Sequence, residues 1–154
     1  MGGQGTEEGL TQIYYLQTCT WRLGAQLQYR TYFAAAAATT GVAAQKRIYF
    51  LGGTGAGTPH GANQIYTPEN DGWTTGTSMP TSRINLTVTV INDTIYALEG
   101  NHHPTAGYIV SSATNEQYTP ADYIPELPSW LTLHSFLVAT LVVVTVKRKV
   151  FRPT

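Results

Sequence analysis

Three histidines, His60, His102 and His103, are the side chains of this chain whose type and grouping suggest metal binding. A metal site needs several ligands that converge on one point. His102 and His103 are adjacent, and adjacent side chains on a strand project to opposite faces of the sheet, so the two imidazoles do not converge. We therefore interpret the three histidines as loop residues, and we predict no metal, no cofactor and no catalytic residue.

A glycine-rich stretch, "GGTGAG" at 52–57, superficially matches a phosphate-binding loop. Such a loop holds phosphate through backbone N–H groups at the start of a helix, and no helix pattern follows this stretch. We therefore interpret it as a connection between strands. Only 12% of the residues are charged and the formal net charge is zero, which argues against a nucleic-acid partner. The lone Cys19 excludes an internal disulfide.

These glycines belong to an internal repeat. The stretch "RIYFLGG" at 47–53 returns as "TIYALEG" at 94–100, and "TQIYYLQTCTW" at 11–21 returns as "NQIYTPENDGW" at 63–73. A third, partial copy begins with "NEQYTP" at 115–120. Repeats of roughly fifty residues are typical of stacked supersecondary units. The recurring residues are Tyr14, Trp21, Gly52, Gly53, Tyr66, Trp73, Gly100 and Tyr118.

Each copy of the repeat has the pattern of β-structure. The stretch "NLTVTVIND" at 85–93 alternates apolar and polar residues before a polar turn, which is the period of a strand with unlike faces. In register with it, "AAAAA" at 34–38 predicts the corresponding strand of the preceding copy. The stretches "RIYFLGG", "ANQIYTPEN" and "GWTTGTSMP" predict the other strands of the unit. Such a unit of short strands predicts a propeller blade.

Three features together resemble the kelch repeats of β-propellers: the glycine-ended strand at 48–53, the spacing of Tyr66 and Trp73, and the segment 79–83. The resemblance covers residues 1–123 and implies an all-β, incomplete propeller of about two blades and a partial third. Some kelch-like propellers are copper oxidases or sugar isomerases, but none of their catalytic residues can be placed on this chain. Three features depart from the pattern: Glu99 replaces a glycine, "QLQYR" at 26–30 stands where "SMPTSR" stands at 78–83, and no Trp follows Tyr118 at the expected distance.

The order of strands in a blade also predicts a binding face. Successive antiparallel strands reverse direction, so the loops at 54–62, 79–84 and 101–114 should emerge on the same side. Loops on a rigid scaffold commonly carry recognition. We therefore predict that this side contacts a partner through His60, Arg83, His102, His103 and Tyr108.

The composition changes after residue 123. Residues 124–129 form a proline-containing linker, and residues 127–146 contain no Asp, Glu, Lys or Arg. A helix of about 20 residues spans the hydrocarbon core of a bilayer. We predict a transmembrane helix at 130–146, with Trp130 at the interface, and a basic cytoplasmic tail at 147–154. The alternative is that "FLVATLVVVTV" at 136–146 is a buried strand that completes the last blade.

A short linker, one apolar helix and a basic end also resemble the C-terminal anchors of archaeal surface proteins. The sequence thus predicts a single-pass protein of the cell membrane whose repeats face outward and bind a protein or a glycan, as in adhesion. Two alternatives stay open: a fragment of a kelch-type enzyme, either an oxidase or a glycan-processing isomerase or lyase, with its active residues in other blades, or a structural repeat of the cell surface. We also expect the chain to be the C-terminal piece of a longer protein, and to self-associate through open blade edges when alone.

Overall fold

The computed structural model describes residues 9–55, 58–102 and 108–125. Contacts divide the chain into two units, Met1–Tyr123 and Ile124–Thr154, and the fold below is that of the first. All regular elements among the described residues are β-strands, and the paired strands run antiparallel to each other. The all-β prediction is confirmed, whereas the propeller stays a prediction.

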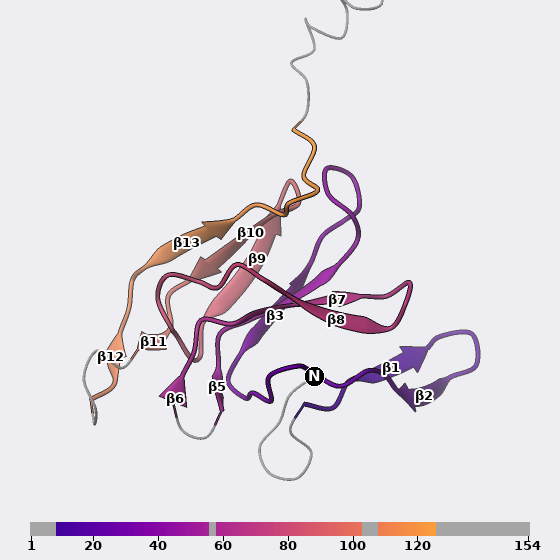
Figure 1. Cartoon of the computed structure of the whole chain (residues 1–154), viewed down its shortest axis with the longest axis horizontal. Helices are drawn as coiled ribbons and strands as arrows, with labels where there is room; N and C mark the ends of the chain where they lie inside the picture. The colour runs from indigo at the N-terminus through magenta and orange to yellow at the C-terminus, as the bar shows by residue number, and fades with distance from the viewer. Residues whose placement is uncertain (1–8, 56–57, 103–107, 126–154) are drawn as a thin grey trace, which may run out of the picture. The chain divides into compact units, whose positions relative to one another are not determined.

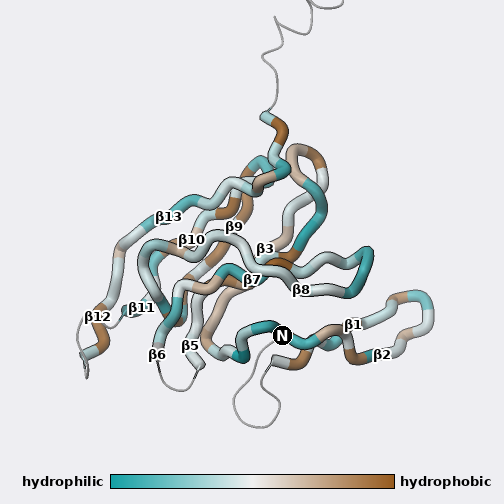
Figure 2. The backbone as a smooth tube through the Cα atoms, in the orientation of Figure 1, coloured by the Kyte–Doolittle hydropathy of each residue, from teal (hydrophilic) through white to brown (hydrophobic). Residues whose placement is uncertain are grey.

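A four-stranded sheet occupies the middle of the unit (Figure 1). Each of its strands ends at turn-forming residues; the turn after the third strand, at 68–71, is polar and appears teal in Figure 2. Pro68 cannot continue a hydrogen-bonded ladder, which explains why the strand ends at Thr67. In sheet order, the strands are β3 (Ala35–Ala38), β4 (Ile48–Leu51), β7 (Asn63–Thr67) and β8 (Gly72–Gly76).

A three-stranded sheet and a hairpin flank this sheet in the chain. The three-stranded sheet has the order β13 (Asn115–Tyr118), β10 (Thr94–Leu98), β9 (Thr87–Ile91). The hairpin consists of β1 (Gln12–Tyr15) and β2 (Thr20–Leu23). Two short ribbons occupy connections that the sequence predicted as loops: β5 (Thr54–Gly55) with β6 (Thr58–Pro59), and β11 (Asn101–His102) with β12 (Val110–Ser111).

Apolar side chains cover both faces of the four-stranded sheet. Tyr49 and Leu51 of β4 belong to a buried cluster with Ile95 of β10. Phe50, which lies between them in the chain, belongs to a second cluster with Trp73 of β8. Because side chains alternate along a strand, these clusters lie on opposite faces of the sheet. Each fully buried apolar side chain contributes roughly 1.5–3 kcal/mol to folding.

Asp93 ties the two larger sheets together. Its carboxylate, in the turn between β9 and β10, accepts hydrogen bonds from the backbone N–H groups of Val42, Ala43 and Ala44 at 2.9, 2.7 and 3.0 Å. The N–H and hydroxyl of Thr40 donate to it as well. Burial alone raises the pKa of Asp93, but these donors outweigh burial and hold the pKa well below its usual range.

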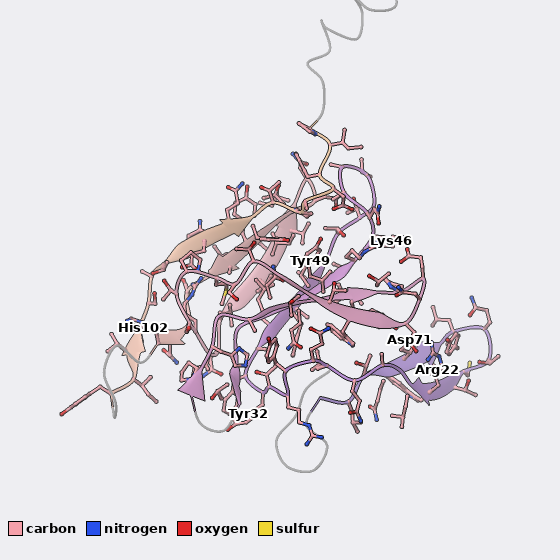
Figure 3. All side chains as sticks on the ribbon, viewed as in Figure 1. Arg22, Tyr32, Lys46, Tyr49, Asp71 and His102 are labelled. Atoms are coloured by element: carbon pink, nitrogen blue, oxygen red, sulfur yellow. The ribbon has the colours of Figure 1, made fainter. Side chains whose placement is uncertain are left out.

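Asp71 ties the β1–β2 hairpin to the four-stranded sheet. Its carboxylate accepts hydrogen bonds from Arg22 Nη1 at 2.7 Å, from Ala25 N at 3.0 Å and from the Tyr66 hydroxyl at 2.8 Å. Figure 3 shows Arg22 and Asp71 side by side. The hydrogen bond from Arg22 is the largest of the effects that lower the pKa of Asp71 to about 2.

The glycine pair of the repeat has a conformational reason. Gly53 has a φ of +92°, and a Cβ built on it would lie 2.3 Å from Thr31 Oγ1. Gly52, with a φ of +67°, precedes it, and Glu99 takes the equivalent position in the next copy with a φ of +54°. The left-handed backbone is therefore kept although the glycine is not, at a steric cost of roughly 1–2 kcal/mol.

The predicted helix at 130–146, the tail at 147–154 and most of the linker at 124–129 lie outside the described residues. Among residues 9–55, 58–102 and 108–125, no helix has the length and apolar character needed to cross a membrane. The membrane anchor and the domain boundaries stay predictions.

Candidate binding surface

Backbone hydrogen bonds join the segments that were predicted to form one face. Met79 N donates to Gly61 O at 2.8 Å, and Ile84 N donates to Asn101 O at 2.9 Å. The ribbons β5–β6 and β11–β12 lie on this side of the sheets (Figure 1). We call this side the loop face; it comprises the described parts of 54–62, 79–84 and 101–114.

Arg83 lies inside the protein rather than on the loop face. Its side chain is 0% exposed and donates from Nη2 to Glu116 Oε2 at 2.7 Å. Nη1 donates to the carbonyl oxygens of Glu99 at 2.7 Å and Thr114 at 2.8 Å. The expectation that Arg83 contacts a partner disagrees with this placement, because a fully buried guanidinium whose Nη1 and Nη2 are held by these acceptors cannot reach a ligand. Its role is structural.

His60 and His102 are both partly buried on the loop face. The Nδ1 atom of His60 accepts a hydrogen bond from Ala62 N at 3.4 Å. The Nε2 atom of His60 and the Nδ1 atom of His102 are buried and have no hydrogen-bond partner among the described residues. Burial lowers the pKa of His60, so its imidazole is neutral at pH 7.

Of the remaining predicted contacts, Tyr108 lies two residues before Val110, which pairs with His102 in the β11–β12 ribbon. Tyr108 is 72% exposed and precedes Ile109 and Val110, which are exposed as well. Within the part of the chain that the structure describes, no hydrogen bond joins Tyr108, His60 and His102, and no group of His, Cys, Asp and Glu is arranged to hold a metal ion. His103 lies outside that part.

A cavity of about 330 Å³ opens beside His60. Its walls come from β7, from β8 and from Tyr29, which precedes β3. The backbone of Tyr29 is fixed by the buried Gln64, because Tyr29 N donates to Gln64 Oε1 at 2.8 Å and Gln64 Nε2 donates to Tyr29 O at 2.9 Å. The aromatic ring of Tyr29 stays exposed. The polar residues that line the cavity are Tyr29, His60, Asn63, Thr75 and Ser78.

The chemistry of this cavity is polar and uncharged. None of the described residues that line it is Asp, Glu, Lys or Arg, and the pKa of His60 is lowered. An aromatic ring, hydroxyls and an amide can bind a neutral ligand that carries hydroxyl groups, through ring packing and hydrogen bonds.

Sequence reasoning missed Tyr29 and Asn63. Tyr29 lies in a segment that departs from the repeat pattern, so no strand or loop assignment pointed to it. Asn63 opens a strand at a position that is also polar in the other copies, Thr11 and Asn115. That recurrence of polar residues is the signal that would have singled out Asn63.

Comparison with known proteins assigns no family to this chain. No family model matches the sequence, and no curated protein matches it. The kelch resemblance therefore stays a proposal.

Proposed function

We propose that the chain is the outward-facing, membrane-anchored binding part of a kelch-type surface protein, and that the loop face binds a glycan. The observation that carries this proposal is the uncharged cavity of about 330 Å³ between Tyr29 and His60. Ligand sites commonly combine an aromatic wall with a few polar groups. A sugar presents an apolar ring face and several hydroxyl groups, which are complementary to such walls.

The position of the cavity supports recognition rather than folding. Gln64 holds the backbone of Tyr29, so the exposed ring is not needed to keep the segment in place. A rigid wall loses little conformational entropy when a ligand binds. The loop face can therefore serve as a preformed site for adhesion.

Membrane attachment is supported by sequence alone. Residues 130–146 have the length and composition of a span, and Lys147, Arg148, Lys149 and Arg152 follow it. Basic residues favour the cytoplasmic side, which directs the repeats outward. An outward orientation suits a module that binds glycans of another cell or of the surrounding matrix.

An array of immobilised neutral and acidic oligosaccharides tests this function. We expect the full chain in detergent micelles to bind neutral oligosaccharides, and Tyr29→Ala and His60→Ala to weaken binding about tenfold or more, as loss of a central contact does. Lys46→Ala is the control, because Lys46 lies at the opposite ends of the strands from Tyr32 and His102 (Figure 3). Binding that is abolished by Lys46→Ala and unaffected by Tyr29→Ala would contradict the assignment. Binding of folded protein to peptides but to no oligosaccharide would replace the glycan with a protein ligand.

A further inference from the structure

The structure repeats individual contacts at the spacing of the sequence repeat. Leu27 N donates to Gly9 O at 2.9 Å. Met79 and Gly61, each 52 residues later, make the same bond at 2.8 Å. Environments in one copy can therefore be compared residue by residue with those in the next.

Trp73 shows what surrounds the repeat's tryptophan when it is buried. Its ring packs with Leu27 and lies 5.1 Å from the ring of Tyr66 between centroids. The indole Nε1 donates to Thr11 Oγ1 and to Ala25 O, each at 3.1 Å. Apolar contacts and both hydrogen bonds therefore fix the ring in one place.

The next copy has residues equivalent to those around Trp73, but no tryptophan at the equivalent position of the sequence. A cavity of about 170 Å³ lies there between β13 and the segment 77–80, which follows β8, and we call it the tryptophan cavity. A cavity of roughly 150 Å³ is large enough to hold a benzene ring, so this one has room for an aromatic side chain. Its walls include Thr77, Met79, Ile95, Ala97 and Tyr118, which correspond to Ala25, Leu27, Ile48, Phe50 and Tyr66 around Trp73.

An unpaired acceptor lies near Tyr118, a wall residue of this cavity. Asn63 is 1% exposed, and its Oδ1 accepts no hydrogen bond from a described residue. It corresponds to Thr11, whose Oγ1 accepts the indole N–H of Trp73. A Cβ built on Gly76 would touch both Asn63 Nδ2, at 2.8 Å, and Tyr118 Oη, at 2.9 Å, so Asn63 and the cavity wall are neighbours. Buried acceptors without a donor are uncommon in folded proteins.

The hairpin carries a tryptophan without a comparable environment. Trp21 is 67% exposed. It opposes Tyr14 across β1 and β2, as Trp73 opposes Tyr66, and the ring centroids lie 5.0 Å apart. Among the described strands, β2 pairs with β1 alone and β13 with β10 alone, so each has an edge to which a strand can be added.

We propose that Trp21 of one copy of this chain enters the tryptophan cavity of a second copy. The edge of β2 that β1 leaves free in the first copy then pairs with the free edge of β13, Trp21 lies beside Tyr118, and its indole N–H donates to Asn63 Oδ1. Strand addition of this kind supplies backbone hydrogen bonds together with a side-chain anchor. The chain's own hairpin does not reach the cavity, because the two lie on opposite faces of the four-stranded sheet.

The association is head to tail. Each copy that donates Trp21 keeps its own tryptophan cavity available, so further copies add in the same direction. Such a heterologous interface closes into a ring when its rotation permits and otherwise continues as a filament.

The same chain contains a competing occupant, Trp130. In both complete copies the tryptophan follows the tyrosine by 7 residues, as Trp73 follows Tyr66, whereas Trp130 follows Tyr118 by 12. Pro125 and Pro128 interrupt the segment between them, and proline does not donate to a sheet ladder. Trp21 therefore fits the position better.

The first test is the mass of the full chain in detergent micelles, measured by sedimentation over a range of protein concentrations. We expect assemblies larger than one chain, and we expect Trp21→Ala to raise the dissociation constant about thirtyfold or more, as for a central aromatic contact. Leu16→Ala is the matched control, because Leu16 is an exposed apolar residue of the same hairpin. Its assemblies should equal those of the unmodified chain.

The second test mixes two variants that are each defective at one end. Trp21→Ala lacks the anchor, and Thr77→Arg places a charged side chain at the wall of the cavity. Each variant alone should be a single chain, and a mixture in equal amounts should give a dimer and nothing larger. Thr74→Arg, on the exposed part of β8 outside the cavity wall, should assemble as the unmodified chain does.

Three results would overturn the proposal. Assemblies that survive Trp21→Ala would place the contact elsewhere. Two defective variants that fail to form a dimer on mixing, although both are folded by circular dichroism, would exclude a head-to-tail contact. A single chain whose unfolding midpoint falls with Trp130→Ala but not with Trp21→Ala would put the chain's own C-terminal segment in the cavity.

Discussion

Trp21 and Trp73 occupy the same position in successive copies of one repeat, yet Trp21 is 67% exposed and Trp73 is 7% exposed. Both oppose a tyrosine across a strand pair. The difference arises from the neighbouring copy, because Thr11, Ala25 and Leu27 supply the surroundings of Trp73. The described residues provide no such neighbour for Trp21.

This comparison predicts that the same substitution has a large effect on stability at Trp73 and a small one at Trp21. Trp73→Ala should lower the free energy of unfolding by about 3–5 kcal/mol, because it leaves a cavity and removes two hydrogen bonds. Trp21→Ala should change it by less than about 0.5 kcal/mol in dilute solution, as for an exposed residue. Urea unfolding at low protein concentration measures both. Equal effects would contradict the assigned environments.

Arg83 should matter for stability and not for binding. Arg83→Met removes a buried cation and the hydrogen bonds that it donates to Glu116 Oε2 and to three carbonyl groups, so the free energy of unfolding should fall by about 3–5 kcal/mol. Combining it with Glu116→Gln should cost less than the sum of the single changes, because the two side chains form a pair. Urea unfolding of the four proteins gives this coupling. Additive losses would show that the pair is not formed.

The conformation of the glycine pair predicts that a substitution at Glu99 raises stability and that one at Gly53 lowers it. Glu99→Gly should raise the free energy of unfolding by a few tenths to about 1 kcal/mol, since it relieves a left-handed φ of +54°. Gly53→Ala should lower it by more than 1 kcal/mol or so, because a Cβ would clash with Thr31 Oγ1 and Tyr32 O. Thermal unfolding compares the two. A destabilised Glu99→Gly protein would refute the strain at Glu99.

Acid should weaken the attachment of the hairpin. The pKa of Asp71 is lowered to about 2, below the usual value of about 4. The folded protein thus holds this carboxyl ionised more strongly than the unfolded chain does. Its stabilisation is complete above pH 4 or so and is lost as the pH falls toward about 2. Urea midpoints at neutral pH and in this acidic range should differ more for the unmodified protein than for Asp71→Asn. Equal differences would contradict the role of Asp71.

Protease treatment of intact cells checks the proposed topology. With the repeats outside and residues 147–154 in the cytoplasm, added protease should digest the repeats and spare a C-terminal tag. The reason is the cluster of basic residues after the predicted span. Permeabilised cells, in which the tag should be lost, are the control. Protected repeats in intact cells would argue for the opposite orientation or against a span.

The sequence predicted the long strands well because their local patterns agree with their packing. Alternation in 85–93 anticipated β9 and the turn that follows it, and the alanines at 34–38 were placed by register with that strand. The short ribbons were missed because two-residue strands have no period to detect. In both copies the first strand of the ribbon also bridges to a preceding segment, Thr54 to Tyr32 and Asn101 to Ile84.

The candidate site was predicted only at the level of loops. The sequence indicated which loops share a side, but not that Arg83 turns inward, because its carbonyl partners come from main chain whose position depends on tertiary packing. The contacts of Asp71 and Asp93 were likewise not predicted, because the sequence of a turn does not show which distant N–H groups donate to its aspartate. The cavity beside Tyr29 requires the segments before β3 and after β8 to meet.

The environment of Trp21 in the assembled protein tests the central claim most directly. Fluorine NMR of the full chain containing fluorotryptophan reports all three tryptophans, and the Trp21 signal is identified by its loss in Trp21→Phe. On raising the protein concentration, the Trp21 signal should move and lose its sensitivity to exchange of H₂O for D₂O, while the signal of Trp73 stays unchanged. A Trp21 signal that keeps full solvent sensitivity in assembled protein would contradict the account.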